Sequence, residues 1–546
     1  MKGGIARRVI ALSSEQHPHQ FSSCSSLPFL SILEKCSCLK ELKKIHAQAI
    51  ISGLSQFAYI TSRILARYTE TGDMDDAYQL FDSINSPTIF NWNTIIRGFS
   101  RSFEPERGLF VFIKMRRTAV RPNMHAFPFA VKACGAILSL SQIHALVFVF
   151  GFNLDVYVTS SLIRNYSNFG EIELACRVFN ECSLKNVVCW TSLISGYCSH
   201  DLLDRARQLF DEMPEKSDAS WSAMVSGYVQ NKRYEEAMEL FLEMKGSVSA
   251  NLNISLLVSA LNACSAVGVF DEGRWIHSYI DFKGLEYGLE LGTALLDFYA
   301  KCGFIEKARE VFDKMHGKDV TTWSAMIAGL AMNGNSHFAV QFFSEMLKSK
   351  VQPNAVTFIG LLTACNHGGL VDEGITYFKD MVAIHGISPS IEHYGCMVDL
   401  LSRAGKTKEA ERMILSMPIE PDGAIWGSLL HGCFVHGDNE WGERGGSHII
   451  KVEPEHHGRY VGLANAYASM GRWEGVAMVR RAMKERRIMA TAGWSLVEVS
   501  GSAHRFLAND NTHPMVHEIY QILSDLTMDM VLNLSNSCEG GFEMVS

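Results

Sequence analysis

The stretch from Val320 to Asn354, VTTWSAMIAGLAMNGNSHFAVQFFSEMLKSKVQPN, reads as two short amphipathic helices followed by an exit loop. In its first half, apolar residues recur at helical spacing and predict one buried face: Trp323, Met326, Ile327 and Leu330. An Asn-Gly-Asn sequence then breaks the helix, and a second apolar face follows with Ala339, Phe342, Phe343 and Met346. Two helices of about 15 residues cannot bury an apolar face on each side alone, so this unit requires copies of itself as neighbours.

Copies of the unit occur along most of the chain. The clearest begin at Ala58, Ile89, Val156, Val187, Asp218, Leu289, Val320 and Ile391. The twentieth residue of each copy is Ala or Gly, which lets the second helix approach the first. The twenty-fourth is Phe in every copy but the last, and this bulky side chain is expected to fill the layer between repeats. Variant copies begin near Ser26, Met124, Ile254 and Ala355, and the unit length varies between about 31, 35 and 36 residues.

The composition is that of a folded chain with several domains or a repeat array. It has 546 residues, of which 47% are hydrophobic and 20% charged. The net charge of −8 argues against a protein that binds nucleic acid through bulk positive charge, although it leaves readout by a local groove open. The fourteen cysteines include no CxxC pair, and Cys134, Cys264 and Cys365 fall at equivalent apolar positions, so buried free thiols are expected.

The first 25 residues differ from the rest. Lys2, Arg7 and Arg8 precede the only acidic residue, Glu15, and serines are frequent. This pattern is typical of a mitochondrial or chloroplast transit peptide, with a disordered extension as the alternative. No apolar run approaches the length of a membrane span, so no membrane partner is expected.

A degenerate repeat of about 35 residues, with Trp followed by Asn or Ser at its fourth and fifth positions and Pro-Asn at its end, resembles the pentatricopeptide repeat. The mixed lengths resemble the plant organellar subclass that alternates long, short and standard repeats. The resemblance implies an all-α fold, a right-handed solenoid of helix-turn-helix repeats. The resemblance divides the chain into five parts. They are a transit peptide or disordered segment at 1–25, twelve repeats at 26–422, E-type motifs at 423–488, an E+-like extension at 489–525 and a tail at 526–546.

The sequence contains no signature of an enzyme. Some members of the resembled subclass end in a deaminase domain, whose zinc chemistry needs an HxE followed by CxxC. This chain has no such pair, nor a Walker lysine loop or an HExxH, so no catalytic residue, cofactor or metal is expected. His431, Cys433 and His436 cannot converge on one ion because residues two apart on a helix face away from each other. Three Ile-His pairs, ending in His46, His144 and His277, are expected to be packing or polar helix positions.

The resemblance places base recognition on the fifth and the last residue of each repeat. These residues form the pairs Ser62 with Thr88, Asn93 with Asn123, Ser160 with Asn186, Thr191 with Ser217, Ser222 with Asn253, Thr293 with Asp319, and Ser324 with Asn354. All fourteen are small polar residues, which suits hydrogen bonding to a base edge. The alternative is that they are helix caps and polar loop residues. Second-position residues, which flank the base in the family, include Phe90, Val188 and Thr321, whereas Trp92, Trp190, Trp221 and Trp323 are expected in the core.

The family's pairing rules imply a pyrimidine for Asn with Asn, adenine for Ser with Asn and guanine for Thr with Asp. From Ile89 to Asp422 the implied target is 5′-Y-N-A-N-A-N-G-A-N-N-3′. The resemblance thus implies a sequence-specific organellar RNA-binding protein, a site-recognition factor for C-to-U editing. A deaminase-bearing protein and other editing factors would act in trans. The alternatives are a factor for RNA stabilisation, splicing or translation, and a protein-binding helical scaffold. The expected compartment is the mitochondrion, with the chloroplast as the alternative.

Overall fold

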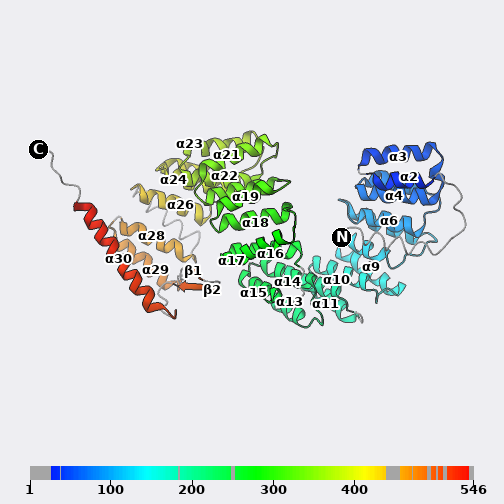
Figure 1. Ribbon diagram of the computed structural model, residues 1–546, viewed down its shortest axis with the longest axis horizontal. Coiled ribbons are helices and arrows are strands. Elements are labelled where there is room, and N and C mark those ends of the chain that lie inside the picture. Colours follow the sequence, from blue (N-terminus) through cyan, green and yellow to red (C-terminus); the bar gives the residue numbers. More distant parts are fainter. Residues whose placement is uncertain are drawn as a thin grey trace. The chain divides into compact units, whose positions relative to one another are not determined.

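The computed structural model describes residues 26–36, 38–182, 185–246, 252–437, 455–469, 471–488, 494–499, 502–507 and 513–539 (Figure 1). The segment expected as a transit peptide, 1–25, lies outside these residues. The described chain is almost entirely helical, as expected, and it divides into two compact units, Met1–Asn231 and Lys232–Ser546.

The first unit is a series of short helices. They are α2 (Ser26–Lys35), α3 (Leu39–Ile51), the 3₁₀ turn η1 (Leu54–Gln56), α4 (Ala58–Thr71), α5 (Met74–Asp82), α6 (Ile89–Phe99), α7 (Pro105–Arg116), α8 (Ala126–Lys132), α9 (Ile137–Phe150), α10 (Val156–Asn168), α11 (Ile172–Glu181), α12 (Val187–Ser199), α13 (Leu203–Asp211) and α14 (Asp218–Gln230).

The second unit continues the series and ends in a hairpin and a long helix. Its elements are α15 (Tyr234–Lys245), α16 (Ile254–Val267), α17 (Phe270–Phe282), α18 (Leu289–Lys301), α19 (Ile305–Lys314), α20 (Val320–Met332), α21 (Ser336–Lys348), α22 (Ala355–Gly368), α23 (Val371–Ala383), α24 (Ile391–Arg403), α25 (Thr407–Ser416), α26 (Gly423–Val435), α28 (His457–Ser469), α29 (Trp473–Glu485), β1 (Trp494–Val499), β2 (Ser502–Leu507) and α30 (Val516–Glu539).

Each of the eight clear sequence copies begins at the first residue of a helix. Inside each unit the first helices of successive repeats pack side by side, as α4, α6 and α8 do in one unit and α18, α20 and α22 in the other. Second helices pack on the first helix of their own repeat and on that of the next, as α13 does with α12 and α14 and α21 does with α20 and α22. The repeats therefore bury their apolar faces against one another, as stacked units must.

The turn inside a repeat has a definite local cause. In the copy beginning at Val320, Gly334 takes a left-handed conformation with φ of 73°. The backbone N–H of Gly334 donates to the carbonyl of Ala331 at 3.2 Å, and that of Asn335 donates to Leu330 at 2.9 Å. These two bonds close α20 with a Schellman motif, which a residue with a Cβ would adopt at a cost. The second helix can then fold back on the first.

One aromatic contact recurs between neighbouring repeats. The ring of Trp323 meets the ring of Phe312 edge-on, at a centroid distance of 4.8 Å and an angle of 75°. The equivalent pairs lie at 4.7 Å for Phe81 and Trp92, 4.9 Å for Phe179 and Trp190, and 4.9 Å for Phe210 and Trp221. Trp92, Trp221 and Trp323 are buried, and Trp190 packs against the same core. The tryptophans are core residues, as predicted.

The cysteines also lie where the sequence predicts. Cys134, Cys264 and Cys365 are free and buried. Burial raises the pKa of the Cys134 thiol to about 11 and that of Cys365 to about 12, so both stay protonated and unreactive near neutral pH.

Near the end of the described chain, β1 and β2 form a two-stranded antiparallel hairpin in which Trp494 is opposite Leu507 and Val499 is opposite Ser502. This hairpin is the only β-structure among the described residues. Across that same part of the chain, no helix combines the length and the apolar character that a bilayer crossing requires.

Candidate nucleic-acid interface

The last residue of a repeat is placed directly before the first helix of the next repeat. The side chains of Thr88, Asn186, Ser217, Asn253 and Asp319 are N-caps that accept a hydrogen bond from a backbone N–H of α6, α12, α14, α16 and α20. Asn354 caps α22 in the same way, and Asn123 accepts from the N–H of Ala126 at 3.2 Å. Capping, the alternative weighed for these residues, is therefore one of their roles.

Capping leaves part of these side chains at the surface. Asn354 is exposed, and its Oδ1 accepts the cap bond from the N–H of Thr357 at 3.0 Å. Its amide nitrogen has no hydrogen-bond partner within the described part of the chain. Thr88 and Asn186 are also exposed. An amide that caps with its oxygen can still donate with its nitrogen, so the cap holds the side chain in place for a ligand.

The fifth residues lie deeper than the last residues. Ser324 is 3% exposed, Ser160 7% and Ser222 8%, while Ser62, Asn93, Thr191 and Thr293 are partly buried. The serine hydroxyl of Ser324 lies 2.7 Å from the carbonyl oxygen of Val320. A fifth residue so enclosed offers little surface to a ligand, and the exposed last residue offers more.

The fifth and last residues of a repeat are joined by a third side chain, which sequence reasoning missed. The Oγ of Ser324 lies 2.7 Å from the Oγ1 of Thr357, the third residue of the next repeat. Thr357 donates in turn to the Oδ1 of Asn354 at 3.1 Å. Because first helices stack side by side, the third residue of one reaches the fifth residue of the one before.

The same bridge occurs in two further repeats. The Oγ1 of Thr293 lies 2.9 Å from the Oγ1 of Thr322, which donates to Asp319 Oδ1 at 2.9 Å. Asn91 donates from its amide to Ser62 at 2.8 Å and accepts from the hydroxyl of Thr88 at 2.6 Å. In the repeat beginning at Ile89 the two residues meet directly, since Asn93 Nδ2 donates to Asn123 Oδ1 at 3.0 Å. Four of the predicted pairs are thus brought together.

Two of the remaining pairs show no such bridge among the described residues. Ser160 donates to the carbonyl of Tyr157 at 3.1 Å, and Thr191 donates to that of Val187 at 2.9 Å. The third residue next to Ser160 is Cys189, whose thiol is a poor bridge. Ser222 and Asn253 belong to different compact units.

The charge of Asp319 fits a hydrogen-bond acceptor. Desolvation raises its pKa, but the hydrogen bonds donated by the backbone and hydroxyl of Thr322 outweigh this and hold the pKa below its usual range. The group is therefore a carboxylate at neutral pH, able to accept from N–H donors such as those of guanine.

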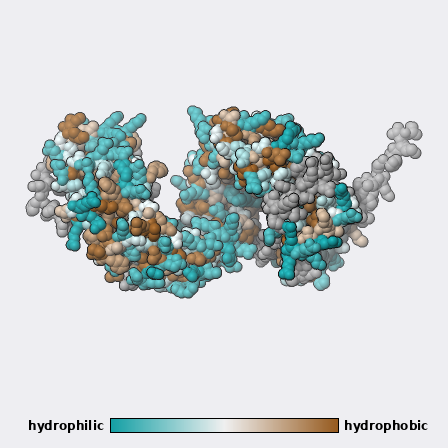
Figure 2. All heavy atoms as spheres, turned by 180° about the vertical axis from the view of Figure 1, so that it is seen from behind, coloured by the Kyte–Doolittle hydropathy of each residue, from teal (hydrophilic) through white to brown (hydrophobic). Residues whose placement is uncertain are grey.

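Second-position residues stand exposed beside the paired residues. Phe90 is 40% exposed, Val188 is 41% exposed, and Thr321 is also exposed. The equivalent Tyr59 and Tyr157 are exposed aromatics that sequence reasoning did not single out, although the repeat register marks them. The guanidinium of Arg63 lies 5.2 Å from the ring centroid of Tyr59. Figure 2 shows hydrophobic residues, in brown, scattered among hydrophilic ones, in teal, on the visible face. Exposed flat or apolar groups suit contact with a base face.

Apart from His431, the histidines and the cysteine that the sequence analysis rejected as metal ligands make hydrogen bonds or pack in the core. His436 bonds through Nε2 to the carbonyl of Arg403 at 2.9 Å, and Cys433 is buried in the core, so neither joins His431 around an ion. His46, His144 and His277 bond through Nδ1 to Tyr68, Tyr166 and Tyr299 at 3.1, 3.0 and 2.6 Å. Each pair links a long repeat to the next one, which confirms the interpretation of the Ile-His pairs as packing positions.

Comparison with known families accounts for most of the chain. A PPR repeat family model matches residues 318–367, and PPR repeat models match 183–214 and, in a second family, 90–118, 157–187, 219–247, 293–320, 356–384 and 392–419. An E motif model matches 436–498, and an E+ motif model matches 503–530.

Individual proteins show the same likeness. The pentatricopeptide repeat-containing protein At5g66520 of Arabidopsis thaliana is 46% identical, covering 90% of this chain and 80% of that protein. The pentatricopeptide repeat-containing protein CRR2, chloroplastic, of the same plant is 31% identical, covering 97% and 77%. The solved structure of the pentatricopeptide repeat protein PPR10 from maize aligns with 16% identity and a TM-score of 0.41, covering 79% of each chain. The chain therefore belongs to the pentatricopeptide repeat family, in the group whose repeats are followed by E and E+ motifs.

Proposed function

We propose that this protein binds single-stranded RNA in an organelle, reading one base per repeat through the paired fifth and last residues. The observation that carries the proposal is the joining of these residues into one polar group in each of four repeats, for example directly in Asn93 with Asn123 and through Thr357 in Ser324 with Asn354. A helical-repeat reader needs such a group, held rigidly, for each base. Phe90, Val188 and Thr321 would flank the bases.

The proposed target keeps the order implied by the pairs, 5′-Y-N-A-N-A-N-G-A-N-N-3′, read from Ile89 to Asp422. Of its specified positions, guanine under Thr293 and Asp319 has the strongest physical support, because the carboxylate of Asp319 stays charged. Adenine under Ser324 and Asn354 is supported by the exposed amide of Asn354. The proposed limits of the reading region remain 26–422, followed by E-type motifs at 423–488, the extension at 489–525 and the tail at 526–546.

The proposed role is recognition of a site for C-to-U editing, with a deaminase supplied in trans. The E and E+ motifs after the repeats favour it, and the chain lacks the HxE and CxxC pair that zinc deamination needs. The chloroplastic relative and the basic first 25 residues favour an organelle. The mitochondrion is the proposed compartment and the chloroplast the alternative. A role in RNA stabilisation, splicing or translation is the second candidate, since the same reading surface would serve it.

Two measurements test the proposal. Binding of the target RNA is compared with binding of an RNA in which the three adenines are replaced by cytosine. We expect a loss of about tenfold or more, because each mismatched base leaves a polar group unpaired. Equal affinity would reject the pairing. Editing of organellar transcripts is then compared with and without the protein. If every cytidine is edited as before, the editing role fails and the second candidate stands.

A further inference from the structure

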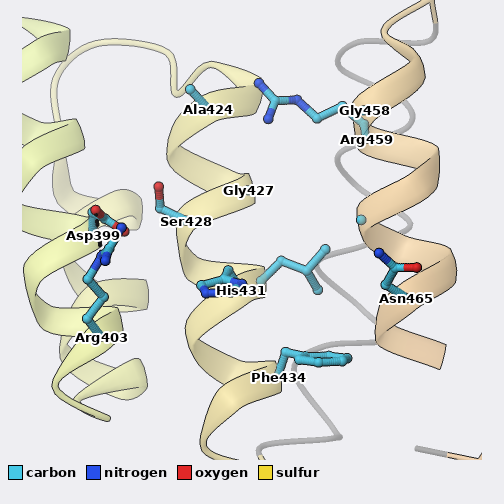
Figure 3. Close-up of a pocket in the computed structure, with 12 residues that line it drawn as sticks. Asp399, Arg403, Ala424, Gly427, Ser428, His431, Phe434, Gly458, Arg459 and Asn465 are labelled. Atoms are coloured by element: carbon cyan, nitrogen blue, oxygen red, sulfur yellow. Dashed lines mark hydrogen bonds and ion pairs between the residues drawn. The ribbon is translucent and has the colours of Figure 1, made fainter. Parts of the chain in front are cut away.

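A cavity of about 600 Å³ lies against α26, bordered by α24 on one side and α28 on the other (Figure 3). Its lining includes Arg403 from α24, Gly427, Ser428 and His431 from α26, and Arg459 and Asn465 from α28. Its size is within the range of pockets that hold a small molecule or one nucleotide. The repeats alone do not account for it, because α28 lies beyond the twelve copies.

The cavity occupies the place that base reading occupies in the repeats. Counted from Gly423, the first residue of α26, the second residue is Ala424 and the fifth is Gly427. Both line the cavity. Where Asn93 and Ser324 carry a polar side chain, this position carries none. The fifth residue of α24, Gly395, also has no side chain, so α26 differs from α24 in the cavity that Gly427 lines.

An arginine fills part of the space that Gly427 leaves. A Cβ on Gly427 would lie 2.9 Å from Nη1 of Arg459, closer than real Cβ contacts allow without movement. In Figure 3 the side chain of Arg459 reaches from α28 toward the first turns of α26. The glycine thus lets a guanidinium lie over the helix face, and a guanidinium has the geometry that suits a phosphate.

The polar groups around the cavity suit a phosphate and a sugar. Arg403 pairs with Asp399 at 2.9 Å, and Asp399 also accepts from Asn366 at 2.6 Å, so this acid is matched by its own partners. Arg459 brings a second guanidinium group to the lining, and Ser428, His431 and Asn465 add hydrogen-bonding groups. Leu430 and Phe434 supply an apolar wall. Guanidinium N–H donors beside an apolar wall fit a sugar with its phosphate.

We propose that this cavity binds the phosphate and ribose of the nucleotide that follows the last base read by the repeats, without selecting its base. The inference rests on the proposed function, since it places one more nucleotide on the same strand at one nucleotide per repeat. An arginine that grips the backbone at this point would hold the strand in register beyond the reading region.

The test uses the full chain and a set of RNAs. One RNA ends at the nucleotide assigned to the repeat 391–422, and others extend it at the 3′ end by one to three nucleotides. We expect extension to raise affinity about tenfold, the value of one charge-assisted contact. An abasic extension should give the same gain. A methylphosphonate at the first added linkage should remove it.

Two variants and a control complete the design. Gly427→Met should fill the cavity and remove the gain while leaving binding of the shorter RNA unchanged, and Met favours a helix more than Gly does. Arg459→Gln should do the same. The control is Arg480→Gln on α29, an exposed residue that does not line the cavity, which removes the same charge and should keep the gain.

The outcomes separate this inference from the proposed function. Normal binding of the shorter RNA with no gain on extension would overturn the inference alone. A gain that is lost with the abasic extension would also overturn it, because the base would then be read. Binding of a glutamate-rich peptide by the normal chain and not by Gly427→Met, with no gain from RNA extension, would assign the cavity to a protein partner. No binding of any RNA would overturn the proposed function itself.

Discussion

Ser324 and Asn354, which we propose form one reading pair, are joined through Thr357 of the next repeat. The Oγ of Ser324 lies 2.7 Å from Thr357 Oγ1, and that hydroxyl lies 3.1 Å from Asn354 Oδ1. The threonine also completes the capping box of its own helix, since its N–H donates to Asn354 Oδ1 at 3.0 Å and its Oγ1 accepts from the N–H of Asn354 at 3.1 Å. Stacking, capping and the proposed reading therefore share three side chains, and substitutions can separate the three roles.

Changing Ser324→Thr together with Asn354→Asp should move base preference at this position from adenine toward guanine. Asp accepts the cap bond from Thr357 as well as Asn does, so the fold should be kept. The pair then matches Thr293 with Asp319, which the chain already contains. The ratio of the affinities for two RNAs that differ only in this base should change by about tenfold. If the array unfolds instead, the two residues are caps and the site assignment is wrong.

Replacing Thr357 by Val should weaken reading more than folding. The substitution keeps the shape but removes the hydroxyl that lies between Ser324 and Asn354. We expect a loss of about 1 kcal/mol of unfolding free energy and a smaller preference for adenine over guanine. Urea unfolding and paired RNA titrations measure the two effects.

The matched control for this substitution is Thr363→Val on the same helix. Thr363 donates to the carbonyl of Ile359 at 2.8 Å and is not part of a reading pair. It should cost a similar amount of stability and leave base preference unchanged. Equal loss of preference in both variants would show that the effect comes from a loosened α22 and not from the bridge.

The sequence carries enough information for the fold because the repeat is local. Trp323, Phe343 and the Gly334 turn are set by spacing within one copy, and the recurrence of that copy predicts the stacking. The proposed reading pairs were also visible, because the fifth and last residues are both polar in seven of the eight clear copies.

The bridge through Thr357 was not predicted, because third residues read as ordinary first-turn positions within their own helix. Their contact with the preceding repeat depends on how closely two helices pack, which no single copy encodes. The cavity over Gly427 was hidden for the same reason. It depends on Arg459, a residue distant in sequence from the helix that it covers.

Lowering the pH should destabilise the fold through the buried His-Tyr pairs. Desolvation lowers the pKa of His46, His144 and His277, so the folded state favours their neutral forms. The stability this provides is complete above the unfolded pKa, about 6.5, and is lost as the pH falls from there through the lowered folded values. The Tm should therefore fall between pH 7 and pH 5.

One long repeat supplies the control for this prediction. Its positions equivalent to His277 and Tyr299 are Phe378, which is partly buried, and Leu401, which is buried in the core, so both are apolar. Copying that pair, as His277→Phe with Tyr299→Leu, should reduce the fall in Tm between pH 7 and pH 5. The nearby Asp281 raises the pKa of His277 and Lys314 lowers it, so Asp281→Asn should steepen the dependence slightly. If Tm falls as much between pH 7 and pH 5 in the double variant as in the normal chain, this His-Tyr pair does not contribute to the pH dependence of stability.

Trp323 and Thr321 should separate stability from RNA affinity. Trp323 is buried edge-on against Phe312, so Trp323→Ala should cost about 3 to 5 kcal/mol of unfolding free energy through the cavity it leaves. Thr321 is exposed two residues earlier on the same helix, and Thr321→Ala should change stability by less than about 0.5 kcal/mol.

Because Thr321 is proposed to flank a base, Thr321→Tyr should instead strengthen RNA binding by adding a stacking surface, as Tyr59 and Tyr157 offer at the same position. Chemical denaturation and RNA titration of the three variants measure both quantities. If Thr321→Tyr binds RNA no better while keeping its stability, second-position residues do not contact the bases.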